Sequence, residues 1–171
     1  MFEFDPEKAL ETLVYVVSRL PRGDLYKTLK AIYIADKLHL SRYGRFIYGE
    51  TYAALQYGPV PQNAYDAVRV LNGERPRSAF PDIALRAALD RTGQRLSILR
   101  EPDVDSLSRS DAECLDEAIR DIEFDSFAAL QLKTHDSAYR ATEPNGTIGI
   151  DAIIDTLPDD RRAAVRNYLA L

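Results

Sequence analysis

The stretch RYGRFIYGETYAALQYGPVPQNAYDAV, residues 42–68, differs from the rest of the 171-residue chain. It holds five of the ten Tyr, three of the eight Gly and two of the nine Pro. A buried Tyr needs a hydrogen-bond partner for its hydroxyl, while Gly and Pro interrupt regular structure. A segment that combines these features serves either as a rigid packing element or as a surface for a partner.

Within this stretch, residues 46–57 are rich in aromatic and β-branched types, which predicts short strands around Gly49. Gly58-Pro59-Val60-Pro61 predicts the end of those strands. Pro61 suits the first position of a following helix, and Asn72-Gly73 suits its end.

Helical patterns precede the stretch. Asp5-Pro6-Glu7 is a helix start, apolar residues follow at helical spacing, and Pro21 and Gly23 end the helix. Asp24 is a suitable cap for a second helix. That helix is predicted to end at Gly44, because a glycine tolerates the positive φ of a helix C-terminus.

Beyond the stretch, residues 83–99 allow two structures. IALRAALDR reads as a helix by propensity, whereas TGQRLSILR reads as a turn and a strand, with a hairpin across Thr92-Gly93. The later pattern is clearer, because Ser108 and Asp111 form a helix-capping signature and Ser126 can cap another helix. We therefore predict a mainly α fold with a small β element (α+β), with strands near 46–57 and a possible pair at 83–99.

Composition narrows the protein class. The net charge of −5 divides into +1 for residues 1–61 and −6 for residues 62–171, and an acidic chain is a poor nucleic-acid binder. No apolar run is long enough to span a membrane, and the N-terminus lacks the layout of a signal peptide. One Cys excludes an internal disulfide, and two His with one Cys disfavour a zinc site. We expect a cytoplasmic protein with no membrane association, cofactor or metal.

An enzymatic role has little support in the sequence. Asp36 and His39 share a helix face and could pair as a general base, with Glu50 nearby, but no nucleophile or phosphate-binding motif accompanies them. An ion pair on a helix face is the simpler interpretation. His135 is expected at a helix C-terminus, where its ring can bond free carbonyls, and Cys114 receives no function. We expect a protein that is not an enzyme.

The tyrosines of the stretch have two interpretations. Tyr48, Tyr52 and Tyr57 are either half-buried strand residues or, with Tyr65, a partner-binding surface. Composition alone does not decide between them.

A wider stretch, residues 25–68, resembles the signature of the Panacea domain, the SocA-like and GepA-like antitoxin domain. The shared pattern is L-Y-x-A-D-x-x-H-L, then Y-G-R-x-I-x-G-D/E-x-Y, then A-x-x-Y-G-P-V-P. Ile34 stands where the family often has Phe, and Tyr139 in THDSAYRA stands where Trp is common. The likeness covers about residues 8–142 and leaves 143–171 as a C-terminal helical extension of one domain, 1–171.

The resemblance implies a mainly helical antitoxin that binds a protein toxin encoded nearby. It leaves open whether the antitoxin blocks the toxin directly or delivers it to an ATP-dependent protease, and whether the chain forms a homodimer. We expect the partner surface to combine the exposed aromatics of the first half with the acidic second half, which suits a basic toxin.

In this interpretation the shared motif is a scaffold, since one motif is poorly suited to choosing among different toxins. Asp36 is expected to accept hydrogen bonds from a backbone N–H or a Tyr of the following strands. The scaffold residues are Tyr33, Asp36, His39, Tyr43, Gly44, Gly49, Glu50, Tyr52, Tyr57, Gly58, Pro59, Pro61 and His135.

The alternative is a DNA-binding transcriptional regulator, because helices followed by a β element resemble a winged helix. In that case basic side chains of the first third would line one side of the protein. These are Arg19, Arg22, Lys27, Lys30, Lys37, Arg42 and Arg45.

Overall fold

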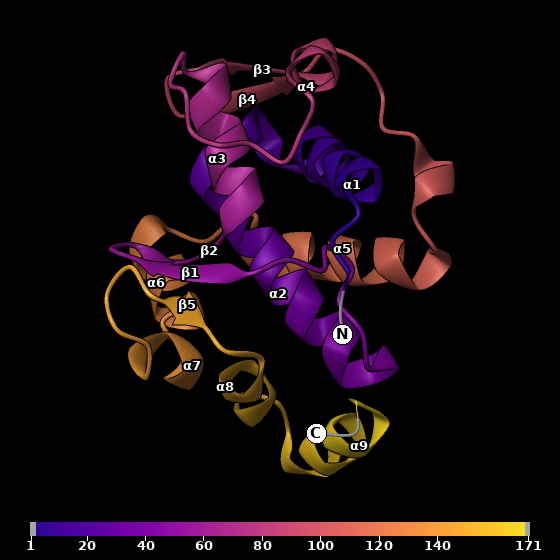
Figure 1. Cartoon of the computed structure of the whole chain (residues 1–171), viewed down its shortest axis with the longest axis vertical. Helices are drawn as coiled ribbons and strands as arrows, with labels where there is room; N and C mark the ends of the chain where they lie inside the picture. The colour runs from indigo at the N-terminus through magenta and orange to yellow at the C-terminus, as the bar shows by residue number, and fades with distance from the viewer. Residues whose placement is uncertain (1–2, 170–171) are drawn as a thin grey trace.

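The helix α2 (Leu25–Tyr43) runs through the middle of the computed structural model, which describes residues 3–169 (Figure 1). Asp24 caps its start by accepting a hydrogen bond from the Lys27 N–H at 2.8 Å. Gly44 ends it in the left-handed conformation, with φ of 70°. Both boundaries agree with the sequence prediction. The helices α1 (Pro6–Arg19) and α5 (Arg109–Ile122) pack against α2.

A small antiparallel sheet crosses α2. Strand β1 (Tyr52–Leu55) pairs with β2 (Gly58–Pro61) on one side and with β5 (Thr147–Ile148) on the other. Of the strands predicted over residues 46–57, β1 is present, but the residues around Gly49 form no strand. The segment predicted to stop those strands, Gly58–Pro61, is itself the strand β2. The two prolines are tolerated in β2 because it is an edge strand, where an N–H facing outward is not needed.

Residues 83–99 contain both structures that the sequence allowed, one after the other. The helix α4 (Asp82–Ala88) leads directly into a hairpin of β3 (Leu89–Thr92) and β4 (Arg95–Ile98). The hairpin lies at one end of the molecule, above α1 and α3 (Gln62–Leu71) (Figure 1).

The remaining elements are short. The Ser108 capping box that opens α5 and the Ser126 cap of α6 both agree with the prediction, whereas Pro61 is the N-cap of α3 and lies one residue before its first turn. The other elements are the 3₁₀ turns η1 (Pro21–Gly23) and η2 (Val104–Ser106), α6 (Phe127–Thr134), α7 (Ser137–Arg140), α8 (Ile150–Asp155) and α9 (Asp159–Leu169).

Two buried apolar clusters hold these elements together. The larger one joins α1, α2, α3, α5 and the hairpin, while the second joins Tyr33, Leu40, Phe46 and Tyr52 to α8 and α9. The predicted C-terminal extension is therefore packed on α2 over its described part, 143–169, and it also supplies β5, which we did not predict. Residues 170–171 of that extension lie outside the described residues.

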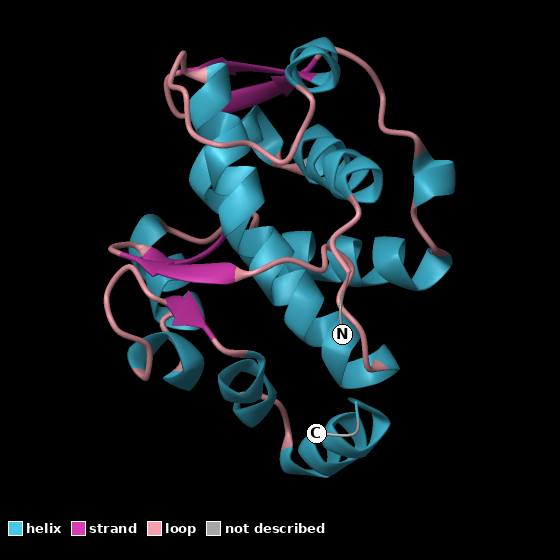
Figure 2. Cartoon of the chain, in the orientation of Figure 1, coloured by secondary structure: helices cyan, strands magenta, loops and turns pink. Residues whose placement is uncertain are grey.

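The predicted fold class is confirmed, since helices dominate and the strands are short (Figure 2). Over residues 3–169, no helix has the length and apolar character needed to cross a membrane.

Candidate functional site

The carboxylate of Asp36 is the centre of the motif region. Its Oδ1 accepts hydrogen bonds from the backbone N–H groups of Ile47 and Tyr48, at 2.7 and 3.0 Å. Its Oδ2 accepts a third from the Tyr52 hydroxyl at 2.6 Å. The side chain is fully enclosed between α2, the loop that follows it and β1. This is the arrangement that we expected for a scaffold residue.

The charge of Asp36 explains the strength of this contact. Burial raises the pKa of Asp36 to about 6, while the hydrogen bonds from Tyr52, Tyr48 and Ile47 act in the opposite direction. The group is therefore ionised at neutral pH and satisfied by three donors, which makes these charge-assisted hydrogen bonds. They also fix the course of residues 44–51, a segment without regular secondary structure.

His39 does not pair with Asp36, so the predicted ion pair is wrong. Its Nδ1 donates to the Arg45 carbonyl at 2.9 Å, and its Nε2 lies 3.0 Å from the Ser110 hydroxyl and 3.2 Å from Asp111. Burial lowers the pKa of His39, so the neutral ring donates through Nδ1 and accepts from Ser110 through Nε2. A fully buried ring with both nitrogens engaged cannot act as a general base on a substrate.

Asp111 forms a second buried centre beside His39. Its carboxylate forms salt bridges with Lys8 at 2.9 Å and with Arg45 at 3.1 Å. It also accepts a hydrogen bond from the Ser108 N–H at 2.9 Å. Burial acts to raise the pKa of Asp111, but the hydrogen bonds from Lys8 and Ser108 outweigh it and hold that pKa below its usual range. Asp111 therefore joins α1 and the end of α2 to the start of α5.

Glu50 supplies the side-chain cap of α3, because Pro61, the N-cap residue of that helix, makes no capping hydrogen bond. Its Oε1 accepts from the Asn63 N–H at 2.6 Å, while Oε2 is buried without a hydrogen-bond partner among the described residues. Burial raises the pKa of Glu50 to about 9, and the hydrogen bond from the Asn63 N–H only partly opposes it. Glu50 is therefore protonated at neutral pH.

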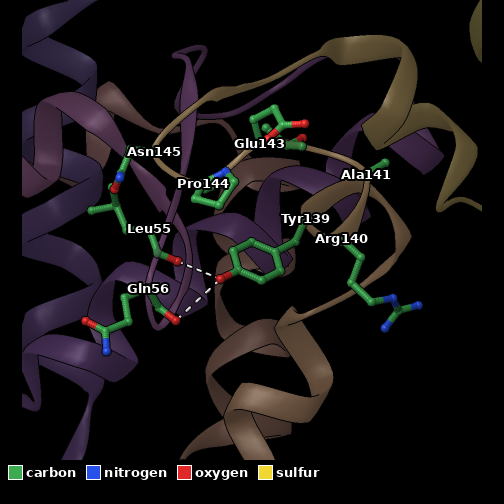
Figure 3. A pocket seen from close by; sticks show the side chains of 10 residues that line it. Leu55, Gln56, Tyr139, Arg140, Ala141, Glu143, Pro144 and Asn145 are labelled. Carbon is green, nitrogen blue, oxygen red and sulfur yellow. Dashed lines mark hydrogen bonds between the residues drawn. The ribbon is translucent and has the colours of Figure 1, made fainter.

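Three side chains hold the tip of the β1–β2 hairpin, two from α2 and one from α7. The Tyr26 hydroxyl donates to the Tyr57 carbonyl at 2.7 Å, and Lys30 Nζ donates to the Pro59 carbonyl at 2.6 Å. On the opposite side the Tyr139 hydroxyl donates to the Leu55 carbonyl at 2.7 Å (Figure 3). The tip is consequently fixed by α2 and α7 as well as by its own ladder.

Gly58 is required by this packing. It has a φ of 110°, and a Cβ there would lie 2.8 Å from Lys30 Nζ and 3.1 Å from the His135 ring. Burial lowers the pKa of Lys30 to about 7. We had predicted that the His135 ring bonds the last carbonyls of α6, but no such hydrogen bond is present among the described residues. The ring stacks on Tyr139 instead, with ring centroids 4.2 Å apart.

The four predicted partner-binding tyrosines fall into two groups. Tyr48 and Tyr52 are each only 1 % exposed, so the proposal that they bind a partner is wrong. Tyr57 is 52 % exposed, and Tyr65 is half-buried at the edge of the larger core. The hydroxyl of Tyr52 donates to Asp36, and this explains why the Tyr52 side chain of β1 faces inward.

The other scaffold residues also have positional roles. Tyr33 donates to Asp136 at 2.9 Å and packs edge-on against Tyr52, with centroids 5.0 Å apart. Gly49 has a φ of 72°, and Gly44 faces the ring of Tyr168 so closely that a Cβ would lie 2.7 Å from it. Tyr43 stacks on His39 at 4.6 Å and is partly exposed, while Pro59 and Pro61 lie buried in β2.

The basic residues that we considered for DNA binding are mostly neutralised. Arg42 forms a two-pronged pair with Glu117, Lys37 pairs with Asp136, and Arg19 pairs with Asp116. Lys30 is fully buried, Arg45 is joined to Asp111, and Lys27 donates to the Glu123 carbonyl. Of the seven, Arg22 alone has no contact to an acidic side chain or a carbonyl among the described residues.

Sequence reasoning missed several members of this network. The side chains that tie the motif to distant segments are those of Tyr26, Lys30, Tyr139, Asp111 and Asp136. The sequence singled out Asp111 only as a helix cap and Tyr139 only as a family position, and it gave no sign of these long-range contacts. Only the place of Lys30 in an otherwise apolar helix face was a possible signal.

Comparison with known proteins gives one match. Residues 29–139 match the family described as Antitoxin SocA-like, Panacea domain. Neither a curated protein nor a solved structure matches the chain. The matched range contains Asp36, the β1–β2 hairpin and Tyr139.

The first prediction concerns Asp36→Ala. Removal of this carboxylate leaves the N–H groups of Ile47 and Tyr48 and the Tyr52 hydroxyl buried without an acceptor, so we expect the free energy of unfolding to fall by about 3–5 kcal/mol. Urea denaturation followed by circular dichroism measures it. Asp90→Ala, at an exposed aspartate of β3, is the control and should change little. An Asp36→Ala curve that overlays the wild-type curve contradicts the scaffold role.

The second prediction concerns Glu50→Gln. Between pH 4.5 and about 9 the folded protein holds a proton on Glu50 that the unfolded chain has released, so wild-type stability falls through this window as pH rises. A glutamine cannot ionise, and the variant should therefore gain stability relative to wild type from pH 5 to pH 8.5. Denaturation at both values tests this, with Glu101→Gln as an exposed control. If the difference in free energy of unfolding between Glu50→Gln and wild type stays constant from pH 5 to pH 8.5, the raised pKa of Glu50 is contradicted.

Proposed function

The chain belongs to the SocA-like Panacea antitoxin family, because the match covers well over half of its length, and we propose that it neutralises a cognate protein toxin by binding it directly. The observation that carries this proposal is that the matched range coincides with the buried network of Asp36 and the pinned hairpin. Such a frame can present fixed surface residues to a partner at little entropic cost.

We also infer that the role is not enzymatic. The side chains that could have formed a catalytic set, Asp36, His39 and Glu50, are buried and engaged in holding backbone groups. These contacts favour a structural role for the three side chains. We propose that the protein acts in the cytoplasm, together with its toxin.

Delivery of the bound toxin to an ATP-dependent protease is a further step that the same complex would allow. We propose direct binding as the step that neutralises the toxin, with degradation as an additional route. The two mechanisms differ in what happens to the toxin after it is bound.

Co-expression tests the proposal most simply. We expect the product of the neighbouring gene to arrest growth when expressed alone, and we expect this protein to restore growth and to co-purify with it. Asp90→Ala serves as a folded control that should restore growth equally. Continued growth arrest with a folded, expressed antitoxin and no complex contradicts the proposal.

Toxin turnover separates the two routes. If direct binding suffices, the toxin half-life after a translation block should be unchanged by the antitoxin while growth is restored. The same measurement in cells that lack the ATP-dependent proteases is the control. A half-life that shortens only when protease and antitoxin are both present would replace direct inhibition with delivery.

A further inference from the structure

A cleft of about 800 Å³ opens beside the hairpin tip, between the start of α2, α3, the β3–β4 hairpin and α6. The helices α2, α3 and α6 and the β1–β2 hairpin supply its aromatic and aliphatic side chains, while the β3–β4 hairpin supplies Arg91 and Gln94. The aromatic ones are Tyr26, Tyr57, Tyr65 and Phe127, and the aliphatic ones include Leu25, Leu29, Val60 and Val68. Charged and amide side chains line it as well, among them Arg91, Gln94 and Asn145, and a concave surface that combines apolar walls with polar groups is the usual form of a binding site.

The aromatic rim of the cleft is exposed and preorganised. Tyr57 and Phe127 are about half exposed, at 52 and 50 %, and their ring centroids lie 5.5 Å apart. Tyr26 packs against Phe127 at 4.5 Å while its hydroxyl holds the Tyr57 carbonyl. Rings held in this way lose little conformational freedom on binding, which is typical of interface hot spots.

The cleft also carries positive charge without a matching carboxylate. Arg91 donates only to the carbonyls of Val68 and Gly93, and Lys30 donates only to the Pro59 carbonyl, within the part of the chain that the structure describes. The other charged groups of the lining are Arg69, which pairs with Glu74, and Asp24, whose carboxylate caps α2 and has no cation partner among the described residues. Lys30, Arg69 and Arg91 face Asp24 and Glu74 here, so the lining has a formal charge of +1 in a protein of net charge −5. Because burial lowers the pKa of Lys30 to about 7, Arg91 is the fully charged cation of the cleft that lacks a carboxylate partner among the described residues.

We propose that this cleft binds the toxin through an apolar or aromatic side chain that lies next to a carboxylate. The apolar group packs between Tyr57 and Phe127, and the carboxylate pairs with the guanidinium of Arg91, which offers a planar fork for it. This inference rests on the proposed antitoxin function and assigns its contact surface.

The charge of this surface differs from the one we expected from composition. The acidic second half of the chain had suggested a basic toxin, but a basic segment in the cleft would place like charges beside Arg91 and Lys30. Other basic side chains of the motif region are already paired with carboxylates, as in Arg42 with Glu117. The unmatched charge is therefore positive at this surface.

Two variants with matched controls test the proposal. Arg91→Glu reverses the unmatched charge, and Tyr57→Ala removes a rim ring whose hydroxyl has no hydrogen-bond partner among the described residues. Arg109→Glu, at a side chain that is 92 % exposed on α5, and Tyr168→Ala, at a tyrosine that is 71 % exposed on α9, are the controls outside the cleft. Calorimetric titration of each purified protein with the product of the neighbouring gene gives the affinity, and melting curves verify folding.

We expect each cleft variant to weaken binding by roughly tenfold or more and each control to stay within about twofold of wild type. The wild-type affinity should also fall as salt is raised, and this dependence should be reduced or reversed in Arg91→Glu. Folded cleft variants that bind as well as the controls would overturn the proposed surface while leaving the antitoxin function intact. Absence of binding by the wild-type protein would instead overturn the antitoxin function itself.

Discussion

The structure depends on one buried carboxylate, that of Asp36. It lies on the central helix and accepts hydrogen bonds from two consecutive backbone N–H groups, those of Ile47 and Tyr48, and from the Tyr52 hydroxyl. A buried ion is costly unless donors surround it, so the loop and strand must keep this geometry for the charge to be tolerated. The carboxylate thereby determines where the chain turns after α2 and where β1 begins.

The β1–β2 hairpin that follows is held in place by side chains of α2 and α7. Tyr26, Lys30 and Tyr139 hold its backbone carbonyls, and Gly58 leaves the space that Lys30 and His135 occupy. These inward contacts leave the Tyr57 ring outside, next to a cleft in which Arg91 has no carboxylate partner among the described residues.

The local signals of the sequence were sufficient for much of this fold. The caps Asp24 and Ser108 and the end of α2 at Gly44 followed from side-chain chemistry that acts within a few residues. The inward role of Asp36 came instead from the resemblance to the Panacea signature, because its partners Ile47, Tyr48 and Tyr52 lie further along the chain. Several failures involve distant partners: β5 pairs with β1 across about 95 residues, and Tyr48 is buried by packing against Phe4. A two-residue strand has no period to detect, and nothing local reveals a cleft made of four separate elements.

Hydrogen exchange at the amides of Ile47 and Tyr48 tests the central claim most directly, because both lie in a segment with no helix or strand. If the Asp36 carboxylate holds this segment as part of the core, these two amides should exchange only through global unfolding, as slowly as the most protected amides of α2. Fast exchange through local opening, at rates typical of an exposed loop, would contradict the account.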